Sequence, residues 1–122
     1  DRAQHLAEQL GGQLGKDRIS AGSDLHRAME EADGLVHATP TGMLKYPGLP
    51  LSADLLRPSL WVAEIVYFPL ETALLRAAKA AGCRTLDGGG MAIFQAAEAF
   101  RLITGIEPDV ERMARHFVSM DA

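Results

Sequence analysis

The chain has 122 residues, of which 48% are hydrophobic and 23% charged, a composition typical of one ordinary globular domain. A formal net charge of −4 without a cluster of lysines and arginines argues against a nucleic-acid partner, and no apolar run approaches the ~20 residues that span a bilayer. The single cysteine, Cys83, excludes an intrachain disulfide framework and a metal site built from several cysteines.

The first part of the chain predicts two amphipathic helices with a short strand between them. Apolar residues recur at helical spacing over 2–10, and the two glycines at 11–12 are expected to end this helix. A short strand is predicted over 18–20. Ser23 and Asp24 are expected to cap a second helix that runs to about residue 32.

The middle of the chain predicts two strands separated by a long loop. Residues 34–38 form a nearly continuous apolar run, which is typical of a strand buried on both faces of a parallel sheet. Three prolines and two glycines make 39–50 a loop, and 60–66 is the next predicted strand.

The last part of the chain predicts three helices and one strand. A helix over 71–81 leads to a strand over 83–86, in which Cys83 is expected to be a small buried residue. Further helices are predicted over 90–104 and 109–120. One apolar stripe should mark the first of these two: Ile93, Ala96, Ala97, Phe100 and Ile103, with Gly105 ending the helix.

This alternation of strands and helices predicts an α/β fold with a parallel sheet and helices on both of its faces. Ligands of such sheets bind outside the carboxyl ends of the strands. Three loops leave those ends here, at 39–50, 67–71 and 87–90, and all combine Gly or Pro with polar or aromatic residues. Taken alone, the glycine run at 88–90 fits a plain turn as well as a binding loop.

Three segments in these loops carry a resemblance to a known family. They read His37-Ala38-Thr39-Pro40-Thr41-Gly42-Met43, Glu64-Ile65-Val66-Tyr67-Phe68-Pro69-Leu70-Glu71-Thr72-Ala73-Leu74-Leu75, and Asp87-Gly88-Gly89-Gly90-Met91 followed by Gln95-Ala96-Ala97-Glu98-Ala99-Phe100 and Thr104-Gly105. In order and spacing they resemble the C-terminal half of shikimate dehydrogenases, and most of all the NAD-using quinate/shikimate dehydrogenases.

The resemblance implies part of a cytoplasmic oxidoreductase that reversibly oxidises shikimate or quinate with NAD or NADP, in aromatic amino acid biosynthesis. The chain would be the C-terminal part of its Rossmann domain, with the helix at 109–120 packing toward a missing substrate domain. That N-terminal domain would supply the catalytic lysine and aspartate, so no catalytic residue is expected in this chain.

The resemblance also implies roles for individual residues. Those expected at the cofactor are Arg2 at its adenosine end, Thr39 and Pro40 along it, and Ile65 and Gly88 beside the nicotinamide. Those expected to reach the substrate are Tyr67 and Gln95. An amide can donate to one substrate hydroxyl and accept from another, and a phenol can donate its O–H. The alternative is that Tyr67 merely caps the core and Gln95 is solvated.

Two residues depart from the pattern of the family. His37 stands where the family usually has Asn, and Glu64 where it usually has Asp. As a lone histidine at a strand end, His37 is expected to be a structural hydrogen-bonding residue, and the four histidines predict no metal site. Lys45 lies in the cofactor-side loop with the wrong spacing for the lysine motif of the family, so it is not expected to be catalytic.

Two features of a complete Rossmann domain are absent from the sequence. It has no G-x-G-x-x-G loop and no acidic residue placed to bind the adenine ribose. The strand at 18–20 would therefore lack a neighbour, and the strand at 34–38 would have an unpaired edge. We expect a piece of a longer enzyme, or an edge covered by another chain, for which a homodimer is one candidate.

The sequence is also compatible with two other functions. One is a different two-domain NAD(P) dehydrogenase, such as a methylene-tetrahydrofolate dehydrogenase or a glutamyl-tRNA reductase. The other is a non-catalytic nucleotide-binding module that kept the fold.

Overall fold

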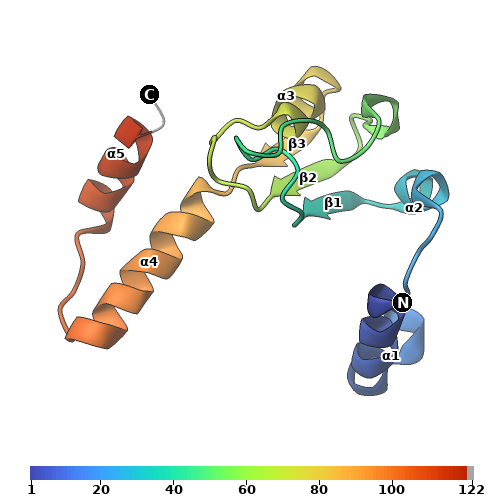
Figure 1. Cartoon of the computed structure of the whole chain (residues 1–122), viewed down its shortest axis with the longest axis horizontal. Coiled ribbons are helices and arrows are strands. Elements are labelled where there is room, and N and C mark those ends of the chain that lie inside the picture. The colour runs from blue at the N-terminus through green and yellow to red at the C-terminus, as the bar shows by residue number, and fades with distance from the viewer. Residues whose placement is uncertain (121–122) are drawn as a thin grey trace. The chain divides into compact units, whose positions relative to one another are not determined.

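The computed structural model of the chain describes residues 1–120. They fall into two compact units, one over Asp1–Glu31 and the other from Ala32 onward. The first unit contains two helices, and the second contains a sheet and the remaining helices. Figure 1 labels the elements of both.

Helix α1 (Arg2–Leu14) opens the first unit and is longer than predicted. Asp1 caps it, because its Oδ1 accepts a hydrogen bond from the Ala3 N–H at 2.7 Å. The prediction that the glycines at 11–12 end this helix was wrong, because a glycine inside a helix costs only about 1 kcal/mol relative to alanine. The helix ends instead at Gly15, whose φ of 99° few other residues adopt.

The strand predicted over 18–20 is not formed, and a 3-10 turn, η1 (Lys16–Arg18), occupies part of this segment. A strand persists only when a neighbour pairs with its backbone groups, and the three strands of the described residues all lie in the other unit. Helix α2 (Leu25–Glu31) follows, and the Asp24 carboxylate accepts from the Arg27 N–H at 3.1 Å, which confirms the predicted cap.

The second unit is built on a parallel sheet, as predicted (Figure 1). Its strands lie in the order β1 (Gly34–His37), β2 (Trp61–Glu64) and β3 (Arg84–Leu86). The register pairs the last residue of β1, His37, with the last residue of β2, Glu64. The loop predicted over 39–50 contains no helix or strand, and a short 3-10 turn, η2 (Ala53–Leu55), follows it.

Helix α3 (Ala73–Ala80) packs against β2 and β3 and buries one face of the sheet. Val62 and Glu64 of β2 point to this face and are buried. The opposite face carries apolar side chains that are largely exposed, such as Val36 at 57% and Leu86 at 69%. The expectation that 34–38 is buried on both faces was therefore wrong, because within this unit α3 covers only one face.

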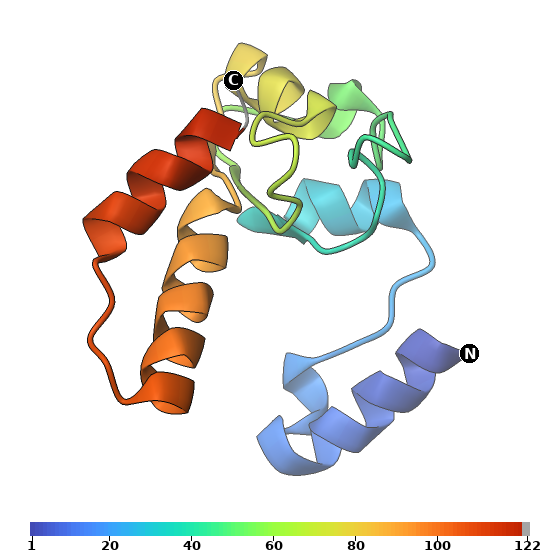
Figure 2. The same ribbon diagram turned by 60° about the vertical axis from the view of Figure 1, so that its left-hand side comes forward.

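Helices α4 (Gly89–Thr104) and α5 (Val110–Met120) lie side by side (Figure 2). Gly105 ends α4 in the left-handed conformation at φ 70°, as predicted. Of the apolar stripe predicted along α4, only Ala97 is buried, and Ile103 is 84% exposed. The far part of α4 projects away from the sheet and packs beside α5, and much of the stripe is exposed in this unit (Figure 1).

Candidate functional site

A mostly apolar pocket of about 530 Å³ lies at the carboxyl ends of β1 and β2. Residues 38–40 and 43–45 line it from the loop after β1, and residues 65–68 line it from the segment after β2. We call it the β1–β2 pocket. Its position is where a parallel α/β sheet binds its ligands, and its polar side chains come from Thr39, Lys45 and Tyr67.

A smaller pocket of about 290 Å³ lies next to it, between α4 and α5, and we call it the α4–α5 pocket. Gln95 lines it from α4, Phe117 lines it from α5, and Tyr67 lines both pockets. The ring centroids of Tyr67 and Phe117 are 6.3 Å apart, with the planes inclined by 48°. Tyr67 therefore stands at the boundary between the two pockets.

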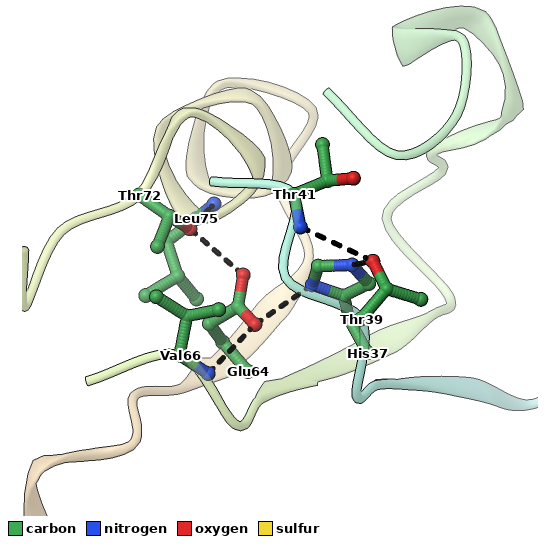
Figure 3. Close-up of polar contacts among 7 residues, drawn as sticks. All are labelled: His37, Thr39, Thr41, Glu64, Val66, Thr72 and Leu75. Carbon is green, nitrogen blue, oxygen red and sulfur yellow. Dashed lines mark hydrogen bonds and ion pairs between the residues drawn. The ribbon is translucent and has the colours of Figure 1, made fainter. Parts of the chain in front are cut away.

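A buried carboxylate, Glu64, stands at the end of β2, just before the segment that lines the β1–β2 pocket, and Figure 3 shows its contacts. Its Oε1 lies 2.8 Å from the His37 Nδ1 and accepts from the Val66 N–H at 3.1 Å. Its Oε2 accepts from the Thr72 hydroxyl at 2.9 Å. The carboxylate thus has donors on both oxygens, which is what a charge buried in this position requires.

Local structure explains why these side chains meet. The parallel register places His37 directly opposite Glu64 on the face of the sheet that α3 covers. Thr72 is the N-cap of α3 and accepts from the Leu75 N–H at 3.3 Å, which leaves its own hydroxyl hydrogen for Glu64. One carboxylate therefore ties together the ends of two strands and the start of a helix.

The network continues from His37 to the surface of the β1–β2 pocket. The His37 Nε2 lies 2.6 Å from the Thr39 Oγ1, which also accepts a longer hydrogen bond of 3.4 Å from the Thr41 N–H (Figure 3). Glu64 and His37 are almost fully buried, whereas Thr39 is exposed and lines the pocket. A chain of polar contacts thus links the buried carboxylate to a hydroxyl that a ligand can reach.

Gly88 sits against the backbone that leaves β2. A Cβ added there would lie 2.9 Å from the carbonyl oxygens of both Ile65 and Val66, and 3.1 Å from that of Glu64. Backbone oxygens cannot move aside as a flexible side chain can, so this position requires glycine. The first glycine of the run at 88–90 is therefore explained by close packing next to the pocket.

Most of the residues for which the sequence predicts a site role are brought together by the fold. Four of them line the β1–β2 pocket: Thr39, Pro40, Ile65 and Tyr67. Gly88 packs on the backbone of Ile65, and Gln95 shares the α4–α5 pocket with Tyr67. Arg2 lies in α1, in the other compact unit, and the structure does not unite it with the rest.

The sequence interpretation missed several contributors to the site. It noted His37 and Glu64 as separate departures from a pattern, although their equivalent positions at neighbouring strand ends could have indicated a pair. It also missed Thr72, which the N-cap preference for threonine before the helical Ala73-Leu74-Leu75 could have indicated. The sequence placed Lys45 in the cofactor-side loop, but nothing in its local sequence indicated that it lines a pocket together with Ile65.

Among residues 1–120, no three His, Cys, Asp or Glu side chains gather in a way that could hold a metal ion. None of the helices described is both long enough and apolar enough to cross a membrane.

Comparison with known proteins relates this geometry to a family. The Shikimate 5'-dehydrogenase C-terminal domain matches residues 88–116. The shikimate dehydrogenase (NADP(+)) of Streptomyces avermitilis is 60% identical over 115 residues, which are 93% of this chain and 40% of that protein. The quinate/shikimate dehydrogenase (NAD(+)) of Corynebacterium efficiens is 49% identical over 121 residues, 98% of this chain and 43% of that protein.

A solved structure shows the same relation in three dimensions. The quinate dehydrogenase from Corynebacterium glutamicum in complex with NAD matches with a TM-score of 0.84 and 46% identity, covering 97% of this chain and 43% of that one. The chain thus spans about 40% of the length of these relatives. In sequence and in fold, this chain is similar to the C-terminal part of the shikimate and quinate dehydrogenases.

Proposed function

We propose that the protein carrying this chain is a cytoplasmic oxidoreductase that reversibly oxidises shikimate or quinate to the 3-dehydro ketone with NAD or NADP, in aromatic amino acid biosynthesis. The observation that carries the proposal is the pair of adjoining pockets that share Tyr67 at the carboxyl ends of the parallel strands. The names of the relatives at 60% and 49% identity support the substrate class and both cofactors.

The β1–β2 pocket fits the nicotinamide end of the cofactor. Its lining is mostly apolar, which suits a flat ring, and its few polar groups suit a single carboxamide. Thr39 and Pro40 would line one side and Ile65 the other, with Gly88 allowing the backbone to pass close behind Ile65. Arg2 is proposed for the adenosine end, on the strength of the resemblance alone.

The α4–α5 pocket would receive one side of the substrate. Gln95 is exposed there, and its Nε2 donates to the Ala92 carbonyl oxygen at 3.1 Å, a contact that a ligand hydroxyl could replace. The Tyr67 hydroxyl would contact the substrate from the boundary with the β1–β2 pocket. These two side chains would orient the ring hydroxyl toward the nicotinamide.

When bound, the nicotinamide accepts the hydride that the substrate carbinol carbon gives up. This chain would hold the ring with Thr39, Pro40 and Ile65 and keep water from its apolar face. We assign the proton transfer to a lysine and an aspartate in an N-terminal domain of the same protein, because the resemblance places those residues there. Helix α5 would pack toward that domain, and a homodimer is the assembly we propose for the whole.

The direct test is an assay of the purified full-length protein with shikimate or quinate and with NAD or NADP, followed by the absorbance of the reduced cofactor. Turnover of either substrate supports the proposal. Turnover of other alcohols alone would favour a different two-domain dehydrogenase. Binding of dinucleotide without any turnover would favour a non-catalytic nucleotide-binding module.

A further inference from the structure

The hydrogen bonds around Glu64 determine which group donates in its contact with His37. The Glu64 carboxylate can only accept, and it already receives the Val66 N–H and the Thr72 O–H. The 2.8 Å contact between Oε1 and the His37 Nδ1 is therefore a hydrogen bond that Nδ1–H donates. A neutral imidazole that donates from Nδ1 has an unprotonated Nε2, which can only accept.

This proton arrangement fixes the role of the Thr39 hydroxyl. At 2.6 Å from the Nε2 of such a neutral ring, the hydroxyl is the group that donates its hydrogen. Its oxygen accepts a long hydrogen bond of 3.4 Å from the Thr41 N–H. Thr39 therefore has no hydrogen left for a ligand and presents a lone pair to the β1–β2 pocket.

We propose that Glu64 and His37 are positioning residues that make Thr39 an obligatory hydrogen-bond acceptor in the β1–β2 pocket. This pocket would then select a flat ring that carries an N–H donor, such as the primary carboxamide of a nicotinamide, over the same ring with a methyl ketone. The inference rests on the proposed function, because it assigns this pocket to the nicotinamide.

The other polar groups of the pocket fit the same ligand chemistry. Lys45 and Tyr67 can donate hydrogen bonds, so they suit the carbonyl oxygen of a carboxamide. Thr39 then suits the amide N–H. A methyl ketone keeps the carbonyl oxygen and loses only the N–H, so it probes the Thr39 contact separately.

The test compares the full-length protein and its variants in binding NAD and its 3-acetylpyridine analogue, each also in the 2′-phosphorylated form. Dissociation constants are measured by direct titration, at one pH and ionic strength for all proteins. Because binding is measured rather than turnover, the different reduction potential of the analogue does not enter. Because the analogue lacks one hydrogen bond, we expect the wild type to bind it roughly 3- to 10-fold more weakly than the carboxamide cofactor.

The quantity compared is the ratio of the dissociation constant of the 3-acetylpyridine analogue to that of the carboxamide cofactor. Thr39→Val removes the acceptor and should weaken binding of the carboxamide cofactor alone, so that this ratio falls to about 1. Thr39→Ser keeps the hydroxyl and should keep the wild-type ratio. His37→Gln offers an amide with one donor and one acceptor in place of the imidazole, so it should also keep the ratio. His37→Leu releases the Thr39 hydrogen and should lower the ratio, with the melting temperature recorded to confirm that the variant is folded.

An unchanged ratio in Thr39→Val would overturn the inference, even if both dissociation constants rise together as they would after a merely structural change. A wild type that binds both cofactors equally would overturn it as well. These results leave the proposed function standing. By contrast, a wild type that binds none of the four dinucleotides would refute the proposed function itself and this inference with it.

Discussion

Glu64 is the residue on which the candidate site depends most. Its two oxygens bind the end of β1 through His37, the segment after β2 through Val66, and the start of α3 through Thr72. The loops that line the β1–β2 pocket begin at these points. A single buried carboxylate therefore sets the geometry of the pocket without lining it.

Replacing Glu64 with Gln should destabilise the protein by about 2–4 kcal/mol, because an amide N–H₂ would face groups that all donate to the carboxylate. The free energy of unfolding in denaturant measures this change. Glu31→Gln is the matched control, because Glu31 pairs with Arg27 on the surface with 69% of its side chain exposed, and it should cost less than about 0.5 kcal/mol. Equal losses in the two variants would contradict the central role of Glu64.

Gly88 provides a second test at the scale of a single residue. Its φ of −80° suits any residue, so Gly88→Ala should be destabilising only because the new Cβ meets two carbonyl oxygens at 2.9 Å. We expect a loss of about 1–3 kcal/mol by thermal or denaturant unfolding. Gly90→Ala is the control, since a Cβ there meets nothing within 4 Å and should stabilise α4 by up to about 1 kcal/mol. A neutral Gly88→Ala would show that the close approach is not a constraint.

Helix α4 carries an ion pair on its exposed surface that gives a pH dependence. Arg101 lowers the pKa of Glu98, chiefly through the hydrogen bonds between their side chains. A carboxyl group with a lowered pKa in the folded state stabilises that state above its unfolded pKa, and this contribution disappears as the pH falls through the folded pKa. The small stability difference between wild type and Arg101→Gln should therefore shrink as the pH falls below the ordinary glutamate pKa, and vanish once the pH is below the lowered pKa of Glu98 in the folded state.

An NMR titration of the Glu98 carboxyl group checks this directly. Its pKa should rise in Arg101→Gln and stay low in Arg84→Gln, which changes an arginine on β3 instead. A Glu98 pKa that is the same in all three proteins would show that the pair does not persist in solution.

At the scale of elements, the sequence predicted most of the helices and strands. It failed to predict where a helix ends when the backbone conformation of a single glycine determines that end. Gly15 ends α1 because its φ is positive, whereas the glycines at 11–12 remain helical, and the composition of the segment does not distinguish the three. Likewise, the apolar run of 34–38 indicated a strand, but only the packing of α3 decided which of its faces is buried.

At the scale of the whole molecule, Gln95 and Tyr67 test the proposed substrate side of the site. Gln95→Ala should raise the KM for shikimate about tenfold, because an amide can make two hydrogen bonds to a polyol, and Tyr67→Phe should raise it about threefold. Steady-state kinetics of the full-length protein measure both. Gln13→Ala on α1 is the control and should leave KM unchanged. Unchanged kinetics in both site variants would remove these residues from the substrate site.

The sequence by itself determined the α/β class, the parallel sheet, the three loops at its carboxyl edge and the family resemblance carried by residues such as Thr39 and Gln95. These features are encoded locally, in hydrophobic period, in turn residues and in motif spacing. Only the tertiary structure decided that His37 and Glu64 form a pair, that Thr72 completes it, and that Tyr67 joins the two pockets. Such contacts depend on strand register and helix packing, which bring together residues that are distant in sequence and have no local signature in common. His37 and Glu64 are 27 positions apart, and Thr72 lies 8 positions from Glu64.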